Sequence, residues 1–338
     1  MQQYKQEWFG NIKGDILAGI VVCLALFPEV IGFMIVAGVP PVVGVYATFF
    51  ITAIAAFFGS SKGMISAAAG SVALVLAHLV SEYGIQYLFA ATILAGVLQV
   101  VLGFLKIGTL MRYIPKPVMI GFVNGLGIMM FTSQLDHFQG SLLLPLLGLL
   151  GIAIIFLFPR VTKKIPAPIV AIFVITAIVL GFGLDVKTLG DMGSISTDLP
   201  RFGIPAVPMT LETLRIIFPT ALSVAIVGLV ESLLTAQLVD EITEEKSDKN
   251  QETLSQGLGN VVSGFFGGIA GCGMIGQTII NLNYGGLGRL ATFLSGFFML
   301  LSVVLLNGSV VQIPVVALAA VMVVVSIETI NWDSIKRL

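Results

Sequence analysis

Long apolar runs separated by short polar loops dominate this chain. A helix that crosses the hydrocarbon core of a bilayer needs about 20 predominantly apolar residues, and ten runs approach that length. We predict spanning helices over Ile16–Val36, Val42–Phe58, Leu88–Leu105, Pro117–Ser133, Leu142–Phe158, Ala167–Gly183, Leu211–Leu238, Thr253–Gly268, Leu290–Leu306 and Val311–Ile327. The pattern therefore predicts an all-α polytopic membrane protein.

Two further apolar segments, Ser71–Val80 and Met274–Asn283, contain only ten residues each. Ten residues make about 15 Å of helix, which is half of a hydrocarbon core about 30 Å thick. Each segment follows a run of small residues, SAAAG (66–70) and GGIAGCG (267–273). We expect half-helices that begin inside the membrane, which brings the number of segments to twelve.

Composition supports a lipid environment. Apolar residues make up 57% of the chain and charged residues 10%, whereas a soluble domain has about 25% charged residues. The net charge of −1 indicates no nucleic-acid partner. Cys23 and Cys272 both lie in apolar stretches, so we interpret them as packing residues rather than as a disulfide or a metal pair. The charged loop 240–252 is interpreted as a solvated connector.

The basic residues predict the orientation. With a cytoplasmic N-terminus and alternating segments, fourteen of the 17 Lys and Arg residues lie inside, and Lys187, Arg201 and Arg215 lie outside. Basic residues favour cytoplasmic loops. The N-terminal residues show no cleavable signal pattern. We therefore expect an integral protein of the plasma (inner) membrane whose N-terminus is cytoplasmic.

Two carboxylates lie deep within predicted helices, Glu29 in the first and Glu231 in the eighth. An ionisable group at mid-membrane costs at least a few kcal/mol and usually marks a transport pathway. Thr235, four residues after Glu231, shares its helix face. The alternative is a protonated carboxyl that serves packing. His78, in the first half-helix, is interpreted as a packing or interfacial residue rather than as a proton relay.

The spacing of these carboxylates indicates an internal repeat. Glu29 precedes Gly70 by 41 residues and Glu231 precedes Gly273 by 42. Seven segments separate the two acidic helices, so the second copy must be inverted relative to the first. Inverted repeats with paired discontinuous helices point to a binding site at the bilayer midplane.

An anion suits such a site. A helix N-terminus presents unpaired N–H groups and about half a positive elementary charge. The small residues before each half-helix allow a ligand to approach the backbone, although they also allow close helix packing. The G-x-G-x-x-G pattern at 271–276 requires a βαβ unit to bind a dinucleotide, and its neighbours here are transmembrane helices.

Four long strings resemble the SulP family of sulfate permeases, and the resemblance extends over essentially the whole chain. They are FPEVIGFMIVAGVPPVVGVYATFF (27–50), IPKPVMIGFVNGLGI (114–128), LVESLLTAQLVDEIT (229–243) and QGLGNVVSGFFGGIAGCGMIGQTIINLNYGG (256–286). The resemblance implies an inverted-repeat fold of the seven-plus-seven type, divided into a core and a gate. It places core helices 1–4 and the start of the gate in 1–135, gate helices 6–7 in 136–210, core helices 8–11 in 211–308 and gate helix 12 in 309–338.

The resemblance also implies roles for individual residues. Family members bind an anion between the N-termini of helices 3 and 10, and coupling ions use carboxylates on helices 1 and 8. Carried over, anion binding involves Ala69, Gly70, Ser71, Gly273, Met274 and Ile275. Coupling involves Glu29, Glu231 and Thr235, of which the last two could hold Na⁺. No cofactor or resident metal is expected.

Two departures from the family pattern stand out. Some relatives have Thr at the positions of Ala69 and Ile275, so backbone N–H groups must contribute more of the binding here. Family members also continue with two more membrane helices and usually a cytoplasmic STAS domain. This chain has neither after residues 313–327, so the resemblance gives repeats of seven plus five segments. A fragment of a longer protein, a partner that supplies the missing helices and a shortened variant would each explain this pattern.

The sequence therefore predicts secondary active transport of a small inorganic anion, with sulfate first, coupled to H⁺ or Na⁺. Bicarbonate or dicarboxylate transport in the same family, a nucleobase permease of the same fold and a channel-like conductor remain alternatives. An enzyme is disfavoured because the helices contain no His/Asp/Cys cluster. The lipid bilayer is the expected environment, and a homodimer remains open.

Overall fold

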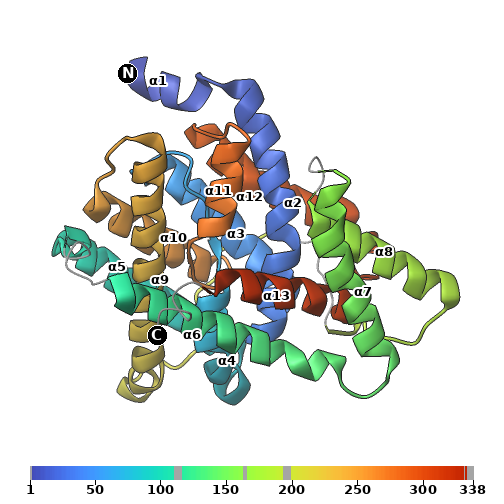
Figure 1. Ribbon diagram of the computed structural model, residues 1–338. Coiled ribbons are helices and arrows are strands. Elements are labelled where there is room, and N and C mark those ends of the chain that lie inside the picture. The colour runs from blue at the N-terminus through green and yellow to red at the C-terminus, as the bar shows by residue number, and fades with distance from the viewer. Residues whose placement is uncertain (1, 110–115, 163–165, 193–198, 331, 333–338) are drawn as a thin grey trace. The chain divides into compact units, whose positions relative to one another are not determined.

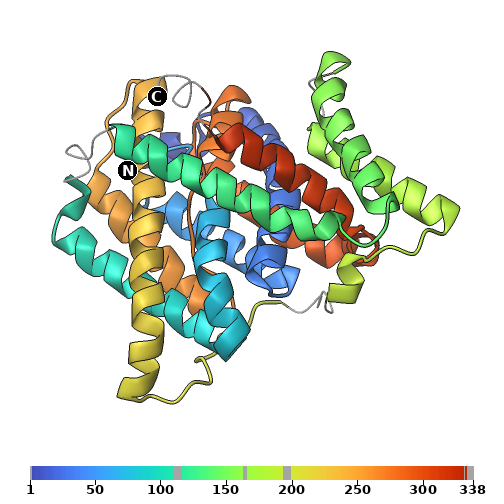
Figure 2. The same cartoon turned by 60° about the horizontal axis from the view of Figure 1, so that its bottom comes forward.

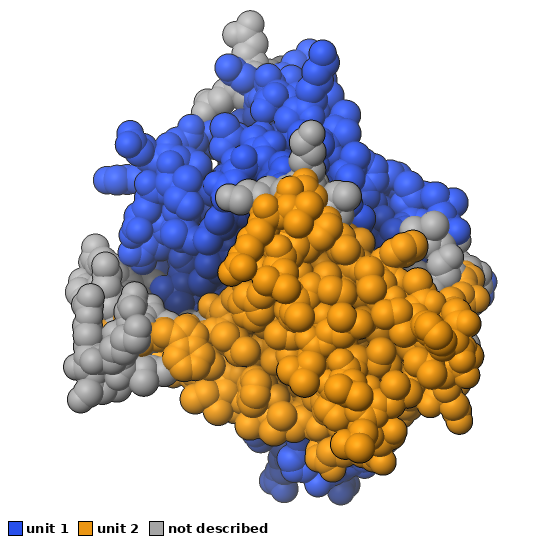
Figure 3. Space-filling view, turned by 45° about the vertical axis from the view of Figure 1, so that its right-hand side comes forward, with its two compact units in different colours: residues 1–112, 197–305 blue, residues 113–196, 306–338 orange. Residues whose placement is uncertain are grey.

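The structure is a computed structural model that describes residues 2–109, 116–162, 166–192, 199–330 and 332. Two compact units divide the chain. The first contains residues 1–112 and 197–305, and the second contains residues 113–196 and 306–338. Figure 3 colours these units separately. Each unit is therefore built from two separate stretches of chain. The division into core and gate at the predicted boundaries stays a prediction.

The first unit holds the two longest helices of the described chain (Figure 1) and a two-stranded ladder. Its elements are α1 (Gln2–Phe9), α2 (Ile12–Ala37), α3 (Pro41–Phe58), β1 (Ser66–Ala68), α4 (Gly70–Tyr83), α5 (Ile85–Phe104), α9 (Leu211–Thr243), α10 (Lys249–Phe265), β2 (Gly271–Gly273), α11 (Ile275–Asn283) and most of α12 (Arg289–Val310). A helix overlaps every predicted span of this unit, although α10 ends at Phe265 rather than at the predicted Gly268. The sequence missed α1 and both strands.

Among the described residues, five helical stretches are long and apolar enough to cross a membrane: α2, α3, α5, residues 143–160 and α9. Shorter apolar helices include α4, α8 and the apolar parts of α12 and α13. The two predicted half-helices are helices of 14 and 9 residues, α4 and α11. The prediction of a polytopic helical membrane protein is confirmed.

Close backbone contact joins α5 to α10. A Cβ atom built on Gly96 would lie 2.6 Å from the carbonyl oxygen of Gly257, and one built on Gly257 would lie 2.7 Å from that of Gly96. Only residues without a side chain allow this approach, as is common between membrane helices. Next to this pair, α9 is one continuous helix of 33 residues, drawn in gold in Figure 2.

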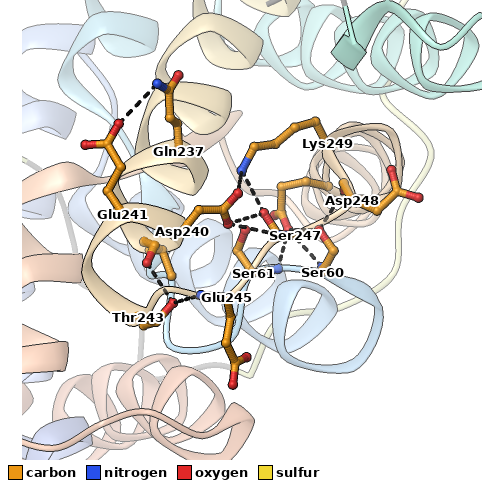
Figure 4. Close-up of polar contacts among 12 residues, drawn as sticks. Ser60, Ser61, Gln237, Asp240, Glu241, Thr243, Glu245, Ser247, Asp248 and Lys249 are labelled. Atoms are coloured by element: carbon orange, nitrogen blue, oxygen red, sulfur yellow. Dashed lines mark hydrogen bonds and ion pairs between the residues drawn. The ribbon is translucent and has the colours of Figure 1, made fainter. Parts of the chain in front are cut away.

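Polar contacts fasten the loop after α3 to the start of α10 (Figure 4). Glu252 is 1% exposed, and its carboxylate accepts the backbone N–H groups of Ser60 (2.9 Å) and Ser61 (3.0 Å). Nearby, Lys249 Nζ lies 2.8 Å from Asp240 Oδ2. The interpretation of 240–252 as a solvated connector is thus wrong for Glu252, because its partners come from a distant loop.

The second unit contains α6 (Lys116–Gln134), η2 (Leu135–Phe138), α7 (Leu143–Leu157), η3 (Phe158–Arg160), α8 (Ala167–Phe182), η4 (Leu189–Met192) and α13 (Val315–Thr329). Figure 2 shows α6 and α13 side by side. We predicted the last helix from Val311, but it begins after Pro314. The carbonyls of Val311 and Ile313 instead accept the N–H groups of residues 190 and 189, each at 2.9 Å.

A tight turn precedes η4. The Asp191 carboxylate accepts the backbone N–H of Thr188 (2.8 Å) and its hydroxyl (2.9 Å). These two hydrogen bonds favour the ionised form and hold the pKa of Asp191 below its ordinary value. The turn thereby presents residues 187–190 to the segment before α13.

Candidate functional site

The two half-helices meet through a short antiparallel ladder. β1 pairs with β2 in the register Ser66–Gly273, Ala67–Cys272 and Ala68–Gly271, and all six residues are buried. Small side chains are needed here, because a Cβ on Gly271 would lie 2.0 Å from the carbonyl oxygen of Ala67. α4 follows one strand and α11 follows the other. Because the strands run in opposite directions, α4 and α11 leave the ladder in opposite directions, as inverted repeats require.

Neither half-helix has a side-chain cap at its N-terminus. Ala69 occupies the N-cap of α4 and Met274 that of α11, and neither side chain accepts a helix N–H. The first backbone N–H groups of a helix have no partner within the helix. Each end therefore offers donors and a partial positive charge to an anion.

Glu231 connects the two half-helix segments. Ser71 Oγ, at the start of α4, donates to Glu231 Oε2 at 2.8 Å. Cys272 Sγ, in β2, donates to the same oxygen at 2.7 Å. In the described part of the chain, no ion pair involves this half-buried carboxylate. Cys272 is free, as predicted, but it is also a partner of Glu231 rather than only a packing residue.

Thr235 and Ser232 hold β2 against α9. Thr235 Oγ1 donates to the carbonyl oxygens of Glu231 (2.8 Å) and Gly273 (3.2 Å). Ser232 Oγ accepts the N–H of Gly273 at 2.9 Å. The hydroxyl of Thr235 is therefore directed at backbone carbonyls, and its predicted part in a Na⁺ site stays a prediction.

Glu29 contacts the other half-helix. It follows Pro28, which removes one backbone hydrogen bond within α2. Its carboxylate accepts the side-chain amide of Gln277, the third residue of α11. Each carboxylate thus bonds to the half-helix of the opposite repeat: Glu29 to Gln277 on α11, and Glu231 to Ser71 on α4. The repeat spacing predicted the carboxylates but not this crossed pairing.

Sequence reasoning missed three buried amides. Asn260 accepts the N–H of Gly271 (2.8 Å) and donates to its carbonyl (3.1 Å). It also donates to Gln99 Oε1 at 2.8 Å. Gln256 Nε2 donates to Ser66 Oγ at 2.6 Å. A polar side chain on one face of an otherwise apolar helix was the available signal, although it does not specify the partner.

The remaining predicted residues differ in their surroundings. Ala69, Ser71 and Gly70 are buried, whereas Ile275 is 37% exposed. A Cβ on Gly273 would lie 2.9 Å from Ser232 Cα, so this glycine serves close packing against α9. Gly276, in the first turn of α11, has open space around its Cβ position. No group of three or more potential metal ligands occurs among the described residues.

Comparisons with known proteins agree with this architecture. A family model described as the sulfate permease family matches residues 12–143 and 141–338. The Bacillus subtilis (strain 168) protein named "Putative sulfate transporter YbaR" is 56% identical over 337 residues, covering 99% of this chain and 70% of that protein. "Bicarbonate transporter BicA" from Picosynechococcus sp. is 29% identical, covering 100% of this chain and 65% of that protein.

Solved structures show the same fold. The transmembrane domain of a cyanobacterial bicarbonate transporter, BicA, matches with a TM-score of 0.90 and 27% identity, covering 97% of this chain and 91% of that one. SLC26A9 matches with a TM-score of 0.85 and 19% identity, covering 95% of this chain and 58% of that one.

These findings confirm the predicted all-α inverted-repeat transporter fold and exclude the enzyme alternative, since the matched proteins are transporters by name. The residues that resemble sulfate permeases at 27–50, 114–128, 229–243 and 256–286 all lie within the stretches matched by the family model. This chain belongs to the sulfate permease family, and it is an integral membrane anion transporter of that family.

Proposed function

We propose that this chain carries sulfate across the plasma (inner) membrane by secondary active transport, with its N-terminus in the cytoplasm and with H⁺ or Na⁺ as the coupling ion. The observation that supports this most is the pair of uncapped half-helix N-termini joined by one ladder, with Glu231 bonded to both segments. The name of the relative YbaR supports sulfate as the anion.

Charge balance supports coupling. Two half-helix ends supply about one positive elementary charge, and an ionised Glu231 cancels it. A dianion between the two ends would then lack compensation. Protonation of Glu231 or Glu29, or a bound cation, supplies the missing positive charge. The site with anion and coupling ion then differs in net charge from the site that holds only one of them, and this difference couples the two. A homodimer is the proposed assembly, in which each chain keeps its own site.

Bicarbonate is the second candidate substrate. It is favoured by the match to the transmembrane domain named for a bicarbonate transporter, which covers 97% of this chain at a TM-score of 0.90. A monoanion would need less compensation from the coupling ion. Because the chain spans 65–70% of these relatives' lengths, activity of the separate chain is part of the proposal.

Uptake by purified protein in liposomes tests both candidates. Labelled sulfate and bicarbonate are offered under imposed H⁺ and Na⁺ gradients, with uracil as a competitor to detect a nucleobase permease. Glu231→Gln keeps the shape and removes the charge. We expect this variant to exchange anion across the membrane but to lose accumulation by about tenfold or more, a loss of at least about 1.4 kcal/mol of coupling.

Matched variants sharpen the test. Glu212→Gln, an exposed carboxylate at the start of the same helix, should leave accumulation unchanged. If Na⁺ is the coupling ion, Thr235→Ala should weaken Na⁺ stimulation while Thr235→Ser preserves it. Unchanged accumulation in Glu231→Gln under both gradients would move coupling to Glu29, and Glu29→Gln would then show the loss.

A further inference from the structure

A groove of about 380 Å³ lies between α4 and α9, away from the strand ladder. Residues 75–83 of α4 form one wall and residues 216–223 of α9 form the other. His78 and Glu82 lie on the first wall, and Thr220 and Ser223 lie on the second. The site described above uses none of these residues. Both walls belong to the first unit.

The groove follows the helix faces that lead to Glu231. Ser71, Val75, His78 and Glu82 repeat at intervals of 4, 3 and 4 residues and therefore share one face of α4. Ser223 and Thr220 precede Glu231 by 8 and 11 residues and share one face of α9.

The two faces meet where Ser71 donates to Glu231 at 2.8 Å. Seven residues separate Ser71 from His78, a rise of about 10 Å. The lining residue nearest to that hydrogen bond is Val75 on α4, four residues after Ser71, and on α9 it is Ser223, eight residues before Glu231. The inner end of the groove therefore lies about 6 Å from Ser71 along α4 and about 12 Å from Glu231 along α9.

Its chemistry suits protons and water better than an anion. His78 Nδ1 lies 3.5 Å from Glu82 Oε1, and both side chains are more than half exposed. Thr220 and Ser223 add hydroxyl groups. The lining contains no Lys or Arg, and it includes a carboxylate that would repel an anion. Histidine and carboxylate side chains are common members of proton relays in membranes.

The surrounding elements add few other charges. Tyr83 lies in the lining, and its ring lies 5.3 Å from that of Tyr87 on α5. α9 contributes Glu212 and Arg215 near its start, and neither lines the groove. On α2, the Glu29 carboxylate accepts from Gln277. His78 and Glu82 are thus the ionisable pair at the end of the groove opposite Glu231.

We propose that this groove is the route by which protons reach Glu231 from the face of the membrane on which it opens, separately from the path of the anion. In the proposed orientation that face is the outer one. The inference rests on proton coupling through Glu231, and it gives His78 a role that the sequence interpretation did not. A proton passes from bulk water to the His78–Glu82 pair and then along bound water to the carboxylate, which becomes neutral.

A block of the groove tests the proposal on the full chain. Ser223→Cys places a thiol in the groove, while the two native cysteines are 5% and 0% exposed. A methanethiosulfonate reagent that carries a trimethylammonium group is then attached. Ser81→Cys is the matched control, since Ser81 is exposed on α4 but does not line the groove.

Two readouts follow the labelled variants. Infrared difference spectroscopy after a drop in pH follows the protonation of Glu231 through its carboxylic acid band. The band is assigned to Glu231 because it is absent from Glu231→Gln. We expect labelled Ser223→Cys to slow its appearance by about tenfold and labelled Ser81→Cys to slow it by less than about twofold. Anion exchange at equal pH on both sides should continue in both. His78→Gln and Glu82→Gln should each slow the appearance of the band without preventing it.

The outcomes separate the two proposals. An unchanged rate in labelled Ser223→Cys, equal slowing by both labels, or no titrating band that Glu231→Gln removes would overturn the groove as a proton route. Equal loss of proton access and anion exchange would also overturn it, since the paths would not be separate. A slowed band in a protein that takes up neither sulfate nor bicarbonate would contradict the proposed function and leave the proton route standing.

Discussion

The two half-helix segments occupy equivalent places in the inverted repeats but are fastened differently. Three side chains of α9 and α10 bond to the backbone of β2. Asn260 bonds to Gly271, and Ser232 and Thr235 bond to Gly273.

By contrast, β1 itself has two bonds to side chains of other elements: Ser66 Oγ accepts from Gln256 at 2.6 Å, and the N–H of Ala68 donates to Thr48 Oγ1 at 3.4 Å. Its further attachments are to the residues before it, where Thr278, Thr292 and Asn281 bond to the backbone of residues 65, 64 and 63. The strand β2 is therefore tied to its neighbours directly, whereas β1 is held mainly through the residues that precede it.

Helix length gives a physical reason for this difference. α11 has 9 residues and α4 has 14. In water, isolated helices shorter than about 12–15 residues are marginal even with good sequences, and α11 lies well below that length. The shorter helix therefore depends more on tertiary hydrogen bonds at its N-terminus. The comparison teaches that inverted symmetry of the backbone does not require the same attachments in the two halves of the site.

Breaking the attachment of β2 should have the largest effect. Asn260→Leu keeps the volume but leaves the buried N–H and carbonyl of Gly271 unpaired, and each such group costs about 1–3 kcal/mol. We expect a lower thermal midpoint in detergent and loss of nearly all uptake in liposomes.

Gln256→Leu is the counterpart on β1. It removes the contacts with Ser66 and Glu252, but Glu252 keeps its bonds from Ser60 and Ser61. We expect a cost of about 1–3 kcal/mol, because the buried hydroxyl of Ser66 loses its partner. Destabilisation by Gln256→Leu as large as that by Asn260→Leu would contradict the weaker direct attachment of β1.

A pair of glycines near α11 separates packing from binding. A side chain at Gly273 would collide with Ser232 Cα at 2.9 Å, whereas the Cβ position of Gly276 is open. We expect Gly273→Val to lower stability by about 1–3 kcal/mol through overpacking. Gly276→Val should fold normally and still reduce anion uptake, because it fills space beside the N-terminus of α11.

Thermal unfolding and uptake distinguish these two glycine variants. Gly181→Val, at another open position, controls for the added side chain on a membrane helix. Normal uptake by Gly276→Val would place the anion away from the first turn of α11.

The smallest expected effects concern the two donors to Glu231. Ser71→Ala and Cys272→Ala each remove one hydrogen bond, from the α4 and β2 sides respectively. A hydrogen bond contributes about 1 kcal/mol net, equivalent to about fivefold in a binding constant. Because a thiol is a weaker donor than a hydroxyl, Ser71→Ala should shift the half-saturating coupling-ion concentration more than Cys272→Ala. A larger shift in Cys272→Ala would reverse the assignment of the stronger partner.

Much of the fold could be predicted from the sequence, because the bilayer imposes a length and a polarity on each spanning helix. The half-helices were also predictable, since short apolar runs after small residues cannot span the membrane. The strands β1 and β2 were not, because three residues of Ser, Ala, Gly and Cys have no period to detect. The start of α13 was missed because apolar composition does not show that residues 311–314 pair with another loop.

The candidate site, like the fold, could be predicted from the sequence only in part. The sequence by itself determined that two carboxylates lie deep in apolar helices and that two half-helices follow them at equal spacing. Only the tertiary structure decided which half-helix each carboxylate contacts. That choice depends on the crossing of inverted repeats, which brings Glu231 to Ser71 and Glu29 to Gln277 over 160 and 248 residues of chain. Helix periodicity specifies the face on which a side chain lies, but its partner is set by packing between segments that are distant in sequence.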